Sequence, residues 1–195
     1  MKKHIGIVIK TYFTKVRKCA LLDYELGMID AIPPSEALSA GSMIEYSLTK
    51  RSQEKFFLQE VDLINIPLQL AKQDILFFHH ILELCYFFML EGSQVPGMYE
   101  LLCRLYHESK TYSLDFKLLF LFKFFVLLGR FPYEGKYQTT FFQELASKPI
   151  DTIISYSIDW NSKHELREWI VSCVMDHPYV QGLKTIHFLE RDRLL

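Results

Sequence analysis

The sequence has almost no excess of charge of either sign, because 22 Lys and Arg residues stand against 23 Asp and Glu residues in a chain of 195. A protein that coats nucleic acid through its overall charge is strongly basic, so this class is excluded. Any contact with nucleic acid must instead come from a local concentration of charge. The low net charge and the 15% aromatic content also exclude a disordered chain.

Cysteine is scarce, and the four residues, Cys19, Cys85, Cys103 and Cys173, include no CxxC pair. A structural zinc ribbon needs two closely spaced pairs, so we expect no metal and no zinc module. A chain of this length buries a sufficient core without disulfides. We therefore expect reduced and mostly buried thiols in a cytoplasmic protein without a cofactor.

Long uninterrupted apolar runs are also missing. The most apolar stretches, residues 75–90 and 118–128, are each interrupted by charged side chains. Neither reaches the roughly 20 apolar residues that cross a bilayer, so we expect buried helices and no membrane partner. The apolar run near the N-terminus stops at Lys10, which predicts that there is no secretory signal peptide.

Sequence motifs of P-loop proteins, serine hydrolases, dinucleotide-binding enzymes and zinc proteases are absent. The one suggestive cluster is His79, His80 and Glu83, whose spacings place them on neighbouring positions of a helix. It indicates either a divalent metal site in a helical enzyme or, more simply, a histidine that is hydrogen-bonded beside the core. With no other catalytic pattern, we expect a protein that is not an enzyme.

The first third of the chain has the pattern of short strands. Alternating or β-rich apolar segments lie at residues 6–13, 19–32, 42–50 and 55–66. Gly27 divides the second segment into two strands joined by a turn. Four or five short strands suggest a small barrel, and the OB-fold is the commonest barrel of that size.

From Leu70 the apolar residues recur every three or four positions, which is the period of a helix face. Helical segments follow at residues 98–107, 114–128, 141–145, 163–175 and 183–195. We therefore predict an α+β protein. It has an N-terminal OB-fold-like β-barrel at residues 1–68 followed by an all-α helical domain at residues 69–195.

Charge is segregated along the predicted β-domain. Residues 1–20 carry no Asp or Glu, residues 21–49 carry no Lys or Arg, and residues 50–55 are again mainly basic. The basic residues of the first and third segments are Lys2, Lys3, Lys10, Lys15, Arg17, Lys18, Lys50, Arg51 and Lys55. If the strands that carry them lie side by side, these residues form one basic face.

Such a face predicts contacts with the phosphates of single-stranded DNA. Tyr12, together with Phe13 and Tyr46, lies in or near it and could stack bases. The alternative interpretation is a solvated basic edge, because lysines often guard an edge strand against pairing with other chains.

Five segments, in order along nearly the whole chain, carry a family resemblance. They are residues 6–11 (GIVIKT), 20–32 (ALLDYELGMIDAI), 79–106 with Tyr99-Glu100-Leu101-Leu102 after a Gly/Pro loop, 116–132 (FKLLFLFKFFVLLGRFP) and 182–190 (GLKTIHFLE). These segments resemble the opening strands, the helical domain, the long apolar helix and the closing segment of RecO, the bacterial recombination mediator.

The resemblance implies a role in DNA repair by homologous recombination. A RecO-type protein binds and anneals single-stranded DNA, contacts RecR and the C-terminal tail of the single-strand binding protein SSB, and helps to load RecA. The resemblance also implies a partner site on the long helix, where Lys117, Phe120 and Lys123 lie near one face. The simpler interpretation of these three residues is a buried phenylalanine between two solvated lysines.

The sequence departs from the RecO pattern at two places. Residues 31–41 contain Glu36 and no basic residue where the family carries a basic loop, and residues 133–162 contain no cysteine where a zinc module is often inserted. The first departure leaves an alternative open, in which the protein is a RecO-like protein-interaction scaffold that has lost DNA binding.

Overall fold

The computed structural model describes residues 2–34, 38–51, 55–66, 68–107, 112–131, 139–153 and 156–185, with the side chains of 51, 55 and 68–73 left out. The chain forms two compact units. The first consists of Met1–Lys72 and Leu82–Val95, and the second of Gln73–Ile81 and Pro96–Leu195. The long helix α1 (Leu68–Phe88) therefore contributes residues to both units.

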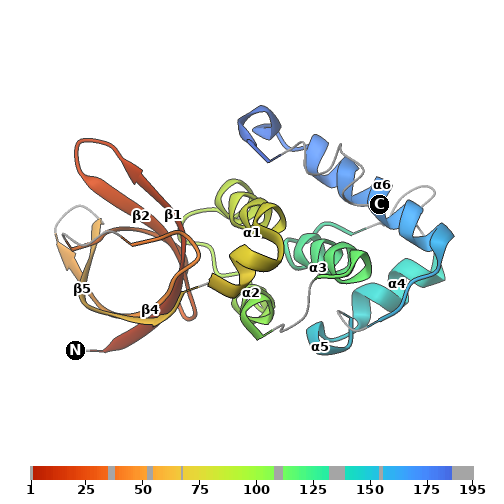
Figure 1. The fold of residues 1–195 in the computed structure, drawn as a ribbon. Coiled ribbons are helices and arrows are strands. Elements are labelled where there is room, and N and C mark those ends of the chain that lie inside the picture. The colour runs from red at the N-terminus through yellow and green to blue at the C-terminus, as the bar shows by residue number, and fades with distance from the viewer. Residues whose placement is uncertain are drawn as a thin grey trace. The chain divides into compact units, whose positions relative to one another are not determined.

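The first unit is built around a five-stranded barrel. Its strands are β1 (Lys3–Phe13), β2 (Arg17–Asp23), β3 (Gly27–Ile32), β4 (Met43–Arg51) and β5 (Lys55–Asn65). The sheet closes in the order β1-β2-β3-β5-β4, and the only parallel pairing among these strands is the short one of β3 with β5 (Figure 1). This topology confirms the predicted α+β fold, with an OB-fold-like barrel ahead of a helical region.

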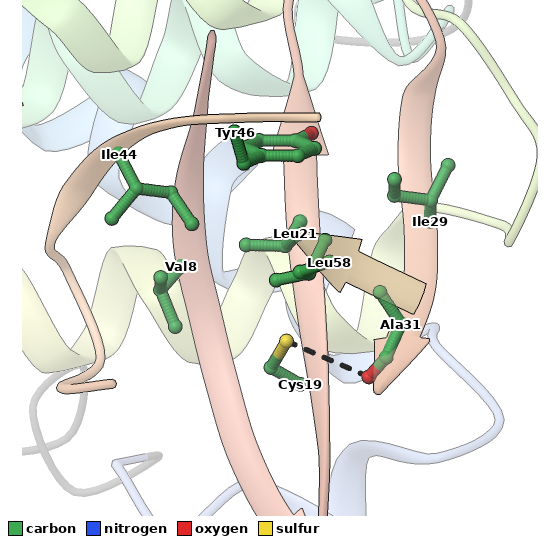
Figure 2. Packing of buried hydrophobic residues seen from close by; sticks show 8 residues of the cluster. All are labelled: Val8, Cys19, Leu21, Ile29, Ala31, Ile44, Tyr46 and Leu58. Carbon is green, nitrogen blue, oxygen red and sulfur yellow. Dashed lines mark hydrogen bonds between the residues drawn. The ribbon is translucent and has the colours of Figure 1, made fainter. Parts of the chain in front are cut away.

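Alternating residues of all five strands fill the barrel interior. Figure 2 shows this core, which consists of Val8, Cys19, Leu21, Ile29, Ala31, Ile44, Tyr46 and Leu58. The hydroxyl of Tyr46 donates a 2.5 Å hydrogen bond to the buried carboxylate of Asp23, so the polar tip of this large side chain is satisfied inside the barrel. On β1 the register shifts between Val8 and Lys10, and the consecutive residues Val8 and Ile9 are both buried.

A segment that follows α1 is hydrogen-bonded to the barrel within the first unit. The amide of Met28 donates to the carbonyl of Ser93 (3.1 Å), and the amide of Gly92 donates to the carbonyl of Met28 (2.7 Å). Gly27 has φ +73°, and a Cβ atom there would lie 2.1 Å from the carbonyl oxygen of Ser93. Only glycine fits both the turn and this close approach.

The second unit is helical. It contains α2 (Met98–His107), α3 (Leu114–Leu127), α4 (Thr140–Ser147), α5 (Ile150–Ile153), α6 (Trp160–Met175) and the 3-10 turn η2 (Val180–Gly182). Helix α3 is central, because nearly every side chain from Phe116 to Val126 is buried. Trp169 of α6 packs against it, with ring centroids 5.0 Å apart at Phe122.

The structure bears on two predictions for the helices, the absence of a membrane-spanning helix and the presence of a last helix at residues 183–195. Among the described residues, none of the helices combines the length and the apolar character that a membrane crossing requires. The helix predicted at residues 183–195 falls mostly on residues 186–195, which lie outside the described part of the chain, and residues 183–185 are not helical.

Candidate nucleic-acid interface

The strand register aligns five residues in one row across the barrel. Thr11 pairs with Cys19, Cys19 with Ala31, Ala31 with Phe56, and Phe56 with Lys50. Neighbouring strands are about 4.8 Å apart, so a row over five strands extends about 19 Å along the barrel surface. The β1–β2 turn and the paired ends of β4 and β5 therefore border the same stretch of the barrel, on either side of β2 and β3 (Figure 1).

This stretch collects six of the ten predicted DNA-contacting residues. We name the set the basic wall, and it consists of Lys15, Arg17, Lys18, Lys50, Arg51 and Lys55. Lys15 and Lys50 are exposed, whereas Arg17 and Lys18 are half-buried. The backbone pairing of Arg51 with Lys55 places both residues at this border, and their side chains lie outside the described part of the structure. The fold thus joins two basic segments that an acidic segment separates in the sequence.

Two aromatic side chains accompany the cations of the basic wall. The guanidinium carbon of Arg17 lies 5.0 Å from the ring centroid of Phe13, and Nζ of Lys50 lies 5.7 Å from that of Phe56. Phe13 is 74% exposed, whereas Phe56 packs partly against the barrel core. A cation within about 6 Å of a ring is attracted by its π electrons. Each pair therefore holds a positive charge beside an aromatic surface at one border of the wall.

Phe57 lies between the two borders and was not predicted as a site residue. Phe57 pairs with Ile32 on one side and with Thr49 on the other. Because Phe56 and Ala31 face the core, side-chain alternation places Phe57 and Ile32 on the outer surface, where both are half-buried. This position follows from the register of the parallel β3–β5 pair, for which the sequence carries no signal.

Lys2 and Lys3 lie away from the basic wall, and acidic side chains surround them. Nζ of Lys2 lies 2.5 Å from the carboxylate of Glu25, and this hydrogen bond lowers the pKa of Glu25. Nζ of Lys3 lies close to three carboxylates, those of Glu45 (3.8 Å), Glu60 (3.6 Å) and Asp62 (3.7 Å). The charges of both lysines are therefore compensated within the barrel.

Lys10 and Tyr12 contact the second half of α1, which belongs to the same unit. Nζ of Lys10 lies 3.7 Å from the ring centroid of Tyr86, and the Tyr12 and Tyr86 rings meet edge to face at 6.4 Å. The hydroxyl of Tyr12 also donates to the carboxylate of Asp30. Burial, and then the neighbouring Asp30, raise the pKa of Tyr12 well above its ordinary value. These contacts give both residues a structural role.

The residues predicted to form a partner site on α3 are all engaged inside the second unit. Phe120 is fully buried, and Lys117 is paired with the carboxylate of Asp74. Lys123 is buried, and its ammonium donates to the carbonyls of Ala146 (3.1 Å) and Lys148 (2.7 Å). Desolvation lowers the pKa of Lys123. The three side chains do not form an exposed surface.

The cluster of His79, His80 and Glu83 falls on α1. His79 is exposed and His80 is buried, with its Nδ1 atom 2.8 Å from the hydroxyl oxygen of Thr185. Within the described ranges, no group of three His, Cys, Asp or Glu side chains could hold a metal ion.

All four cysteines are unpaired. Cys19, Cys85 and Cys173 are buried and Cys103 is half-buried. Burial raises the pKa of Cys103 to about 11 and those of Cys19 and Cys173 to about 12. Since the thiolate is the reactive form, these groups are poor nucleophiles at neutral pH.

Two comparisons of the sequence with known proteins found no match. No protein-family model matches the chain, and no curated protein matches it. The resemblance to RecO therefore stays a prediction.

Proposed function

We propose that this protein binds single-stranded DNA on the basic wall and acts in DNA repair as a recombination mediator of the RecO kind. The observation that supports this proposal is the strand register, which gathers Lys15, Arg17, Lys18 and Lys50 along one stretch of an OB-fold-like barrel. OB-folds bind oligonucleotides between their β1–β2 and β4–β5 turns, on the face of strands 2 and 3. The basic wall occupies that position.

The mechanism would be electrostatic, with no covalent step and no cofactor. Cations of the wall would replace the counterions of a DNA strand, and the released counterions would drive binding. A strand with partly neutralised phosphates repels its complement less, which favours annealing. Contacts with RecR and the SSB tail, assistance to RecA loading and a cytoplasmic location belong to the same proposal, and the resemblance alone supports them.

The test is a fluorescence anisotropy titration of a labelled single-stranded oligonucleotide with the full chain at 50 and 200 mM salt. If six cations of the wall each neutralise one phosphate, the logarithm of the affinity falls with a slope of about −4 against the logarithm of salt. This slope corresponds to roughly a 300-fold loss of affinity between the two salt concentrations. Absence of binding at 50 mM would refute the proposal.

Two double variants separate the basic wall from the overall charge. Both Lys15→Ala/Lys18→Ala and Lys2→Ala/Lys3→Ala remove two positive charges, the first pair at the β1–β2 turn and the second at the start of β1. We expect the first to weaken binding and to make the salt slope shallower by about 1.4, the contribution of two phosphates. The second should have the smaller effect, because its lysines are already paired with carboxylates. Equal effects would show that the wall is not the binding site.

A protein-interaction scaffold without DNA binding is the second proposal. It is favoured by the engagement of Lys2, Lys3 and Lys10 inside the barrel unit, which removes three of the predicted cations from the DNA-binding set. The scaffold predicts that a purified RecR or SSB binds the chain while an oligonucleotide does not bind at any salt concentration.

A further inference from the structure

The basic wall explains attraction to phosphates, but phosphates are the same in single and double strands. Selectivity for a single strand needs a group that contacts a base, and an aromatic ring is the usual one because every base has a π face. Three aromatic residues near the wall, Tyr12, Phe13 and Tyr46, were predicted to stack on bases. In the structure, two of these rings contact other side chains and one is exposed to solvent.

Two of the three rings are already engaged by other side chains of the barrel unit. Tyr46 is fully buried in the barrel core, and its hydroxyl is bonded to Asp23. Tyr12 donates to Asp30 and packs against Tyr86. Phe13, in contrast, is 74% exposed at the end of β1, although exposing a large apolar ring to water is unfavourable.

The β1–β2 hairpin fixes the position of this exposed ring. Phe13 pairs with Arg17 as the last pair of the ladder, and the amide and hydroxyl of Thr14 both donate to the carbonyl of Val16, each at 3.1 Å. The guanidinium of Arg17 lies over the ring at 5.0 Å. Lys15 and Lys18 provide further cations on the same hairpin. The ring is therefore held at a defined place beside several positive charges.

We propose that Phe13 stacks on an unpaired nucleobase and makes the basic wall selective for single strands. Arg17 supports one side of the ring, and the exposed surface remains for the base. In a duplex the π faces of the bases are covered by their neighbours, so only an unpaired or unstacked base reaches the ring. This inference rests on the proposed DNA binding, and it adds the residue and the chemical group that the site recognises.

The test compares Phe13→Ala, Phe13→Trp and the control Tyr24→Ala in anisotropy titrations with the full chain. Tyr24 is also an exposed aromatic residue of the barrel unit, at 55%, and it lies in the β2–β3 turn away from the wall. The probes are a single-stranded oligonucleotide, the same strand with abasic sites throughout, and the corresponding duplex. Each titration is run at 50 and 200 mM salt.

We expect Phe13→Ala to weaken binding of the normal single strand roughly tenfold, with an unchanged salt slope because no phosphate contact is lost. Phe13→Trp should retain the affinity, and its indole fluorescence should change on binding. Wild type and Phe13→Ala should bind the abasic strand equally, and both should bind the duplex equally. Tyr24→Ala should behave as wild type throughout.

Three outcomes would overturn the inference while the proposed function stands. Phe13→Ala could bind the normal strand as tightly as wild type, it could lose as much affinity for the abasic strand, or it could lose salt dependence together with affinity. Failure of wild type to bind any of the three probes would instead refute the proposed function. Binding of wild type, but not Phe13→Ala, to vesicles of anionic phospholipid with no effect on oligonucleotides would reassign the exposed ring to a membrane surface.

Discussion

Gly27 controls how the segment after α1 attaches to the barrel. Its φ of +73° costs a residue with a Cβ atom about 1–2 kcal/mol, and its close contact with Ser93 adds a steric cost. We therefore expect Gly27→Ala to lower the free energy of unfolding by about 3 kcal/mol or more, measured by urea denaturation.

Gly92 provides a matched control for this prediction. It has a similar φ of +78°, but a Cβ atom there would meet nothing within 4 Å. Gly92→Ala should therefore show the backbone cost alone, about 1–2 kcal/mol. Equal losses for the two variants would mean that the contact with Ser93 does not hold the segment on the barrel.

The α3 residues show why single positions were misjudged from the sequence. A lysine in an apolar helix is normally expected to reach water, yet Lys123 is 7% exposed and donates to two carbonyls at the end of α4. The carbonyls at a helix end need partners, and a buried ammonium supplies them. Because nearly all of α3 is apolar, periodicity could not indicate which of its faces was covered.

At the scale of single elements, Asp159 determines where α6 begins. Its carboxylate accepts hydrogen bonds from the amides of Asn161 (3.0 Å) and Ser162 (3.1 Å), which is the geometry of an N-cap. Hydrogen bonds from the Ser162 side chain and backbone lower the pKa of Asp159. The stabilisation is therefore complete above the unfolded-state pKa of about 3.9 and is lost as the pH falls through the lower pKa of the folded state.

We expect Asp159→Ala to lower the melting temperature at pH 7, and the difference from wild type to shrink below about pH 4. Thermal unfolding followed by circular dichroism at several pH values measures both effects. Asp176→Ala, at the other end of α6, is the control. A negative charge near a helix C-terminus is unfavourable, so its removal should not lower the melting temperature. A pH-independent loss in Asp159→Ala would contradict the capping role.

Strands and helices whose apolar residues recur with a clear period were predictable from the sequence. The residues at which they begin, end or break were harder to predict. The strand pattern and a turn at Gly27 were predicted from the sequence; the barrel confirms the strands, and the turn lies just before Gly27, which is the first residue of β3. The start of α6 was placed at Lys163, three residues late, because Asn161 and Ser162 are polar and do not continue the apolar period of the helix. The break inside α1 at Asp74 was missed as well, where the carboxylate accepts from the amide of Phe77 and the backbone is not helical.

At the scale of the molecule, the strand register decides which charges come together. The sequence showed that residues 1–20 and 50–55 are basic, but it could not show that Lys3 lies opposite Ser47 while Lys50 lies in the row of Thr11. Barrel closure staggers the strands, and this stagger depends on the whole set of pairings. The basic residues predicted to form one face therefore divide into the basic wall and a separate group of lysines whose charges are compensated by carboxylates.

The proposed DNA binding at the basic wall leads to a prediction for two complementary strands. With a net charge of −1, the protein gains no affinity from its overall charge, so the proposed attraction of a strand has to be local to the wall. We predict that the full chain accelerates annealing of complementary oligonucleotides at 50 mM salt, measured by loss of donor fluorescence between end labels. The acceleration should fall steeply by 200 mM salt and in Lys15→Ala/Lys18→Ala, because both reduce phosphate neutralisation. If the protein bound DNA but did not accelerate annealing, the basic wall would be a DNA-binding site without annealing activity. The proposal that the protein is a recombination mediator would then fail.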